Sequence, residues 1–166
     1  MRDEGFGDFV RSRGATLSRT AYLLTGDHHL AQDLLQTALA MTYQHWPRVR
    51  DGNPEAYVRR VLHNTYISWW RRREPTHPTP SIEDTAARVD STDATVRRLA
   101  VVEALRVLTP RQRAVVVLRY FEDLTEAQTA EVLGVSTGTV KRLHFDALAR
   151  LRSAAPHLLD DEVAIG

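Results

Sequence analysis

"LTEAQTAEVLGVSTGTVKRLHFDALARL", residues 124–151, carries the signals for two helices joined by a tight turn. Thr125 and Gln128 form a capping box, which predicts a helix N-terminus. Gly134 is a typical helix C-cap, and Ser136 is suited to cap the helix that follows. Two short helices with a glycine turn between them are the layout of a helix-turn-helix, in which the second helix lies in the DNA major groove.

The second of these helices has two different faces. The inner face is apolar, has His144 on its flank, and consists of Val140, Leu143, Ala147, Leu148 and Leu151. We expect the N-terminal turn and outer face to bind DNA through Ser136, Thr137, Thr139, Lys141, Arg142 and Phe145. Phe145 is hard to explain as core on that face, and contact with a thymine methyl is one use for it. An ordinary helical hairpin is the alternative, which the capping boxes and the basic outer face disfavour.

The rest of the chain also carries helical signals. Apolar residues recur at helical spacing over residues 9–24, 29–46 and 54–73. Thr109 and Gln112 form another capping box, which opens a further helix. No β-hairpin signal and no internal repeat interrupts this pattern. We therefore predict an all-α protein.

The charge is unevenly distributed over the 166 residues. Residues 1–73 hold 11 arginines against 7 acids, and residues 97–155 hold 10 basic residues against 6 acids. The stretch 74–96 between them has a net charge of −4 and is rich in Pro, Ser and Thr, which predicts a flexible linker. An acidic tail follows at 156–166. We expect two small, basic helical domains joined by this linker, each in contact with a polyanion.

Several other classes of protein are disfavoured. The chain has no cysteine, which excludes disulfides and Cys-based metal sites. No stretch has the length and apolarity of a membrane span or a signal peptide, so we expect a cytoplasmic protein. His29 and Asp33 lie one helical turn apart, but two ligands are not a metal site. Without a nucleophile–base pair or a Gly-rich phosphate loop, we expect no enzymatic activity, cofactor, metal or small-molecule substrate.

The helix that ends in "SWWRRR", residues 68–73, carries two adjacent tryptophans. Neighbours on a helix point ~100° apart, so the two rings cannot share one face. We place Trp69 in the core, in a stripe with Val58, Val61, Leu62 and Thr65. The opposite face consists of Arg59, Arg60, His63, Asn64, Ile67, Trp70 and Arg71. Aromatic rings among positive charges are typical of surfaces that hold unpaired bases. The alternative is that Trp70 packs on the linker or on the other domain.

Taken together, these features resemble the extracytoplasmic-function (group IV) sigma factors, which belong to the sigma-70 family of bacterial RNA polymerase subunits. The likeness is strongest to the actinobacterial sigma-E-like branch. It is carried by "AYLLTGDHHLAQDLLQ", "YVRRVLHN", "SWWRRR", "LTPRQRAVVVLRYFEDLTEAQTAEVLG" and "GTVK".

The resemblance implies a sigma factor that binds the clamp helices and flap of core RNA polymerase and directs initiation at promoter DNA. Residues 1–73 would be sigma region 2, which contacts the clamp through Asp33, Leu34 and Gln36. The same region would bind and open the −10 element through Arg59, Arg60, His63, Asn64, Trp70 and Arg71. Residues 97–155 would be sigma region 4, whose recognition helix binds the −35 element. An anti-sigma factor is a further candidate partner.

The chain also departs from the family pattern. Gln32 and Thr37 stand where family members usually have acids, and Leu143 and Asp146 stand where recognition helices usually have basic residues. Either Asp146 accepts a hydrogen bond from a cytosine amine or the helix docks differently. The alternative function is a LuxR-like regulator, which shares the C-terminal pattern but normally carries a receiver or ligand domain upstream.

Overall fold

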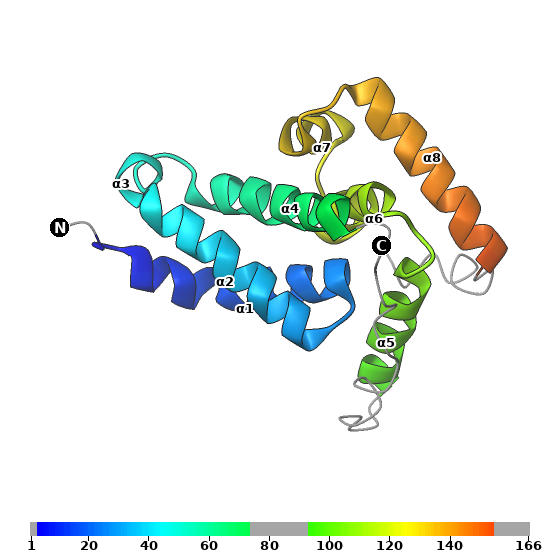
Figure 1. Ribbon diagram of the computed structural model, residues 1–166, viewed down its shortest axis with the longest axis horizontal. Helices are drawn as coiled ribbons and strands as arrows, with labels where there is room; N and C mark the ends of the chain where they lie inside the picture. Colours follow the sequence, from blue (N-terminus) through cyan, green and yellow to red (C-terminus); the bar gives the residue numbers. More distant parts are fainter. Residues whose placement is uncertain (1–2, 74–92, 155–166) are drawn as a thin grey trace. The chain divides into compact units, whose positions relative to one another are not determined.

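The computed structural model describes residues 3–73 and 93–154. These residues form helices with short connections and include no strand, so the all-α prediction is confirmed (Figure 1). The contacts within the chain divide it into two compact units, with the boundary between Arg72 and Arg73. The first unit holds α1 (Phe6–Thr25), α2 (His28–Gln44), α3 (Trp46–Val49) and α4 (Pro54–Arg73).

The second unit holds α5 (Asp93–Leu105), α6 (Pro110–Val116), a π-helical turn η3 (Val117–Phe121), α7 (Glu126–Leu133) and α8 (Thr137–Ala154). Residues 93–96, which we assigned to the linker, form the first turn of α5 instead. Asp93 lies in that turn, where a carboxylate is favourable because the helix dipole is positive at its N-terminus. The remainder of the predicted linker, 74–92, and the predicted tail, 156–166, lie outside the described residues.

The turn between α1 and α2 forms as the sequence predicts. Gly26 adopts a left-handed conformation with φ 69°, and its N–H donates to the carbonyl of Tyr22 at 2.8 Å. The Asp27 carboxylate accepts from the backbone N–H of Leu30 at 2.9 Å and caps α2. This tight reversal packs α2 against α1. The core of the unit contains fully buried leucines from α1, α2 and α4: Leu24, Leu34 and Leu62.

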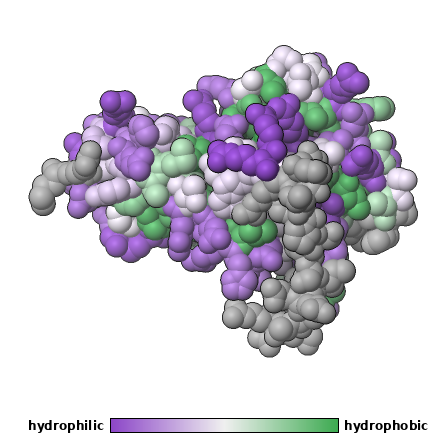
Figure 2. Space-filling view, viewed as in Figure 1, coloured by the Kyte–Doolittle hydropathy of each residue, from purple (hydrophilic) through white to green (hydrophobic). Residues whose placement is uncertain are grey.

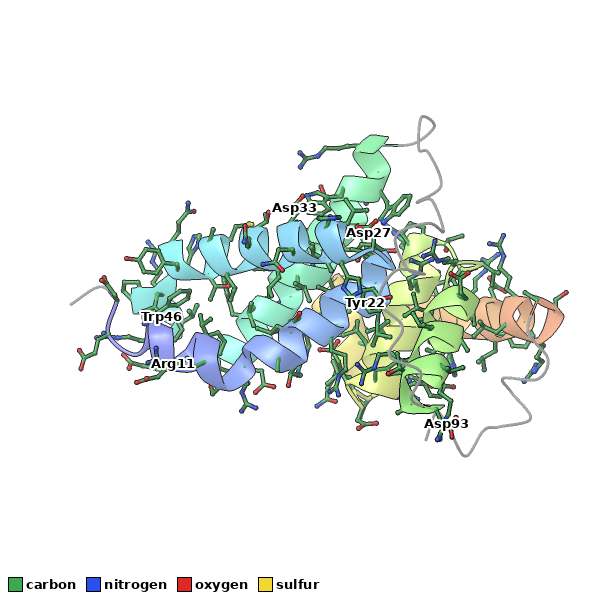
Figure 3. All side chains as sticks on the ribbon, turned by 90° about the horizontal axis from the view of Figure 1, so that it is seen from below. Arg11, Tyr22, Asp27, Asp33, Trp46 and Asp93 are labelled. Atoms are coloured by element: carbon green, nitrogen blue, oxygen red, sulfur yellow. The ribbon has the colours of Figure 1, made fainter. Side chains whose placement is uncertain are left out.

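Trp46 anchors the other end of this unit. Its side chain is 3% exposed, and its indole N–H donates to the carbonyl of Glu4 at 2.8 Å. The rings of Phe6 and Phe9 pack on it with centroids 5.2 and 5.4 Å away. Figure 3 shows Trp46 between α1 and the end of α2. Aromatic packing and one hydrogen bond thus hold the start of the chain against α3.

The buried side of α4 differs from the prediction. Its buried residues are Val58, Leu62, His63 and Tyr66. His63, which we placed on the outward face, is 0% exposed, so that assignment is wrong. At ~100° per residue, Trp69 and Trp70 lie on opposite sides of the line through Leu62 and Tyr66. Both tryptophans are therefore half-buried, and the predicted contrast between a core ring and an outward ring is also wrong.

The core of the second unit lies between α6, η3 and α8. Its fully buried apolar residues include Val115, Leu118, Val140 and Ala147. The capping box at Thr109 forms, with reciprocal hydrogen bonds to Gln112 at 3.1 and 3.3 Å. Inside, the guanidinium of Arg113 donates to the carbonyl of Leu105 at 2.8 Å. The same carbonyl, at the end of α5, also accepts from the backbone N–H of Leu108 at 3.1 Å, so two donors from beyond the helix satisfy it.

Candidate nucleic-acid interface

A helix-turn-helix is built in the second unit as predicted. Thr125 and Gln128 form the capping box that opens α7. Gly134 ends α7 in a left-handed conformation with φ 66°, which glycine adopts without a Cβ clash. The Ser136 hydroxyl accepts from the backbone N–H of Thr139 at 3.1 Å and opens α8. The chain therefore reverses within a few residues and places α8 across α7.

A small apolar cluster fixes the angle between α7 and α8. Val115, Ala130 and Val140 form its buried centre, and Leu133, Val135 and Leu143 pack around them. Leu143 is one of the two departures from the family pattern. Because it packs against this cluster, Leu143 helps to hold α8 against α7.

The other side of α8 is exposed and mostly polar. Among the predicted −35 residues, the exposed ones are Ser136, Thr137, Lys141, Arg142 and Phe145. Thr139 is half-buried, and its hydroxyl shares a 3.0 Å hydrogen bond with Ser136. Phe145 is 72% exposed, the highest value among the large hydrophobic residues that the structure describes. A single exposed apolar side chain is common at protein surfaces, but the position of this ring beside Lys141 and Arg142 leaves it available for contact with a ligand.

Two charged groups accompany this surface. The Lys141 ammonium lies 3.9 Å from the Glu126 carboxylate at the start of α7. Asp146 is exposed on α8, one turn beyond Arg142. Lys141 remains 69% exposed, so the ion pair with Glu126 is weak and leaves the ammonium available to a phosphate.

The residue pair that sequence reasoning missed is Tyr120 with His144. The Tyr120 hydroxyl lies 2.5 Å from Nε2 of His144, and the two rings are 5.4 Å apart. Burial lowers the pKa of His144, nearby Arg119 lowers it further, and Glu126 raises it. Helical periodicity placed His144 on the flank of α8, but no local signal links it to a tyrosine 24 positions earlier.

The predicted −10 surface on α4 is only partly exposed. Arg60, Asn64 and Arg71 are exposed, and the Asn64 amide donates to the carbonyl of Arg60 at 2.8 Å. Arg59 is half-buried and lies 3.6 Å from Glu55, which also pairs with Arg13 of α1 at 3.2 Å. The pair between Arg13 and Glu55 joins α1 to α4, and the pair between Arg59 and Glu55 lies within α4. The exposed surface that remains is narrower than the predicted one.

The predicted polymerase-binding residues of α2 also separate into two groups. Asp33 and Gln36 are exposed, and Figure 3 shows Asp33 on the side of α2 that faces away from α1. Leu34, in contrast, is 0% exposed and belongs to the core. Its assignment to a binding surface is therefore wrong. One helical step of ~100° separates it from each neighbour, so Leu34 cannot share the outward direction of Asp33.

No described part of the chain gathers three or more His, Asp or Glu side chains into a metal site. The described helices likewise include none that is long and apolar enough to cross a membrane. Figure 2 shows hydrophilic residues over much of the visible surface of α1 and α2, with small hydrophobic patches between them. The exposed residues of the predicted sites lie on α2, α4 and α8, and the exposed faces of these helices are the candidate surfaces.

Comparison with known proteins identifies the family. The Sigma-70 region 2 profile matches residues 9–76, and the Sigma-70 region 4 profile matches residues 104–153. RNA polymerase sigma-E factor of Streptomyces antibioticus is 47% identical over 150 residues, 89% of this chain and 82% of that protein. The chain belongs to the sigma-70 family, in its extracytoplasmic-function group. The ECF RNA polymerase sigma factor SigM of Mycobacterium tuberculosis is 33% identical, over 88% of this chain and 74% of that protein.

Solved structures have the same fold as this chain. One is the sigma factor RpoE of Bartonella quintana in complex with the anti-sigma factor NepR, with a TM-score of 0.63 and 22% identity over 89% of this chain and 94% of that one. Another is CnrH in complex with the cytosolic domain of CnrY, with a TM-score of 0.61 and 21% identity over 93% of this chain and 87% of that one. At these identities the likeness concerns the fold.

As a member of this family, the sigma factor binds core RNA polymerase and promoter DNA and directs transcription initiation. Nothing in the comparisons supports the LuxR-like alternative. Sigma factors are initiation factors rather than enzymes, so the bond chemistry belongs to the polymerase.

Proposed function

We propose that the two units of this sigma factor divide promoter recognition between them. The first unit, with α1 to α4, binds core polymerase and the −10 element, and the second, with α5 to α8, binds the −35 element. The observation that carries the proposal is the helix-turn-helix of the second unit, whose α8 has an apolar face in the core and a polar, aromatic face in solvent.

The exposed side of α8 has suitable groups for a major groove. Lys141 and Arg142 supply cations for phosphates or guanine edges, and Phe145 supplies an apolar surface for a thymine methyl. Ser136, Thr137 and Thr139, at the N-terminus of α8, are suited to contact a phosphate there. Because phosphate contacts give affinity and base contacts give specificity, Phe145 and Arg142 are the candidates for sequence preference.

For the −10 element we propose the exposed part of α4. Arg60, Asn64 and Arg71 supply two cations and an amide, and the half-buried Trp70 supplies the ring that remains accessible at their edge. A base that leaves the duplex loses its stacking partner, and an aromatic ring replaces that partner. His63 is no part of this surface, and Arg59 contributes through its ion pair with Glu55.

For core polymerase we propose the exposed side of α2, with Asp33 and Gln36 as the polar contacts. A carboxylate and an amide on one face match a partner surface that offers arginines and backbone groups. A subunit of RNA polymerase acts on the chromosome, so we propose that this chain works in the bacterial cytoplasm. Because one solved neighbour is a sigma factor in complex with an anti-sigma factor, we also propose that an anti-sigma factor binds this chain.

Transcription in vitro tests the proposal. Core RNA polymerase from the same bacterium is mixed with the purified chain and sheared genomic DNA, and the 5′ ends of the transcripts are sequenced. We expect a set of start sites that share one −10 and one −35 element and that disappear without the chain. Start sites with a shared −10 element and no shared −35 element would contradict the role of α8.

A further inference from the structure

The π-helical turn η3 comes directly after α6 and directly before the helix-turn-helix. The backbone N–H of Glu122 donates to the carbonyl of Val117, five residues earlier, at 3.0 Å. Such a turn holds one residue more than an α-helical turn, and π-turns are frequent at functional sites. Here it carries two consecutive side chains that bind the helix-turn-helix. Arg119 donates to the carbonyl of Leu124 at 2.6 Å, just before α7, and Tyr120 contacts His144 of α8 at 2.5 Å.

The contact between Tyr120 and His144 differs in kind from the apolar packing under α8. Val140, Ala147 and Leu151 hold the helix through apolar packing, which has no preferred direction. A hydrogen bond, in contrast, weakens steeply when its angle or length departs from the optimum. The hydrogen bond between Tyr120 and His144 is therefore a directional contact that resists rotation of α8 about its own axis, midway along the helix, while Arg150 donates to the carbonyl of Val107 at 3.2 Å nearer its C-terminal end.

Rotation matters because of where His144 lies. It directly precedes Phe145 and follows Lys141 by one helical turn. Side-chain atoms about 6 Å from the helix axis move by about 2 Å when the helix rotates by ~20°. A displacement of that size takes a donor out of hydrogen-bond range of a base edge. A small rotation of α8 after the loss of the contact at His144 would therefore displace the DNA-facing side chains by enough to break a hydrogen bond.

We propose that Tyr120 and His144 are positioning residues for −35 recognition, because their hydrogen bond sets the rotation at which α8 presents its exposed face to the major groove. The inference rests on the proposed function of α8. Neither side chain needs to touch DNA for this role. Tyr120 acts from η3, and His144 acts through the helix that carries it.

The test uses holoenzyme and a promoter from the start-site experiment, with its −35 element either intact or replaced by an unrelated sequence. Tyr120→Phe removes the hydroxyl and keeps the ring. We expect it to weaken binding to the intact promoter about fivefold, the effect of one lost hydrogen bond, and to leave binding to the replaced template unchanged. Thermal melting of each variant alone checks that the second unit still folds.

Two variants of the histidine provide the matched comparison. His144→Gln keeps an acceptor for the Tyr120 hydroxyl, and we expect binding to the intact promoter within about twofold of wild type. His144→Leu removes the acceptor and should resemble Tyr120→Phe. The double variant Tyr120→Phe with His144→Leu should then lose no more than either single variant, because both changes remove the same bond.

Three outcomes would overturn the inference. Tyr120→Phe could match wild type on both templates, or it could weaken binding to both templates alike, which would indicate a general effect on the holoenzyme. His144→Gln could also prove as weak as His144→Leu, which would assign the effect to lost packing. If wild type itself does not distinguish the two templates, the proposed role of α8 fails, and this inference fails with it.

Discussion

Tyr66 and Trp70 form an edge-to-face aromatic pair on α4, with ring centroids 6.3 Å apart and planes 77° apart. Tyr66 is 1% exposed, so the pair connects the half-buried Trp70 to the core of the first unit. Trp70 is therefore a structural residue as well as a candidate for contact with DNA. This double role changes what its removal should do.

We predict that Trp69→Ala and Trp70→Ala lower the free energy of unfolding by similar amounts. Each ring is half-buried, so we expect about 1–3 kcal/mol, below the ~3–5 kcal/mol of a fully buried aromatic residue. Denaturant unfolding of the two variants measures this. Trp70→Phe is the control, because it keeps a ring beside Tyr66 and should recover most of the loss. A Trp70→Ala variant as stable as wild type would show that the aromatic pair contributes nothing.

Leu34 and Asp33 are neighbours on α2, but Leu34 is buried in the core and Asp33 is exposed to solvent. We predict that Leu34→Ala lowers the free energy of unfolding by about 2–5 kcal/mol, because it leaves a cavity in the core. Asp33→Ala combined with Gln36→Ala should leave the melting temperature nearly unchanged and weaken binding to core polymerase. Unfolding curves and a binding titration with core polymerase measure the two effects. A double variant that binds core polymerase normally would remove α2 from the proposed interface.

The helix-turn-helix could be predicted almost residue by residue, because its signals are local. The capping residues Thr125 and Ser136 and the left-handed Gly134 each act within one turn of helix, and all of them form the bonds expected of them. The separation of α8 into a buried and an exposed face follows from periodicity alone. Leu143 and Phe145 lie on the sides where the 3.6-residue repeat puts them.

Prediction failed where tertiary packing decides between close alternatives. On α4 the core side is centred on Leu62 and Tyr66 rather than nearer Val61 and Thr65, which buries His63 and shifts both tryptophans to the flanks. A histidine among arginines gave no local reason to expect burial. The link from Tyr120 to His144 is likewise long-range, and the π-helical turn that carries Tyr120 has no signature in the letters around it.

The lowered pKa of His144 makes the second unit sensitive to acid. Burial and the charge of Arg119 favour the neutral imidazole, and they outweigh the opposite effect of Glu126. With the folded pKa below the unfolded value of about 6.5, the unfolded chain binds more protons just below that pH, so stability falls as pH falls through that window. Above it, the contribution of His144 to stability is fully present.

We therefore predict that the wild-type chain loses stability as the pH falls from about 7.5 to about 5.5 and that His144→Gln loses less. This interval brackets the unfolded pKa of about 6.5. Denaturant midpoints at several pH values measure this. His29→Gln is the matched control, since it makes the same replacement at an exposed histidine of the first unit, which does not contain Tyr120 or Arg119. An identical pH dependence in His144→Gln and wild type would contradict the prediction.

Asp146 is the acid on the exposed side of α8, one turn beyond Arg142. A carboxylate near DNA phosphates repels them, and the repulsion between two such charges near a protein surface is about 1 kcal/mol at ~10–15 Å. We predict that Asp146→Asn strengthens holoenzyme binding severalfold to promoters with any −35 sequence and that the gain shrinks at high salt. Titrations with a small set of −35 variants at two salt concentrations measure this.

Asp123→Asn is the control, because it removes an exposed acid outside α8 and keeps a side chain that tolerates the left-handed backbone at that position, φ 55°. If Asp146→Asn instead changes preference at one base pair of the −35 element and leaves the rest unaffected, Asp146 accepts a hydrogen bond from a base, and repulsion is not its main effect.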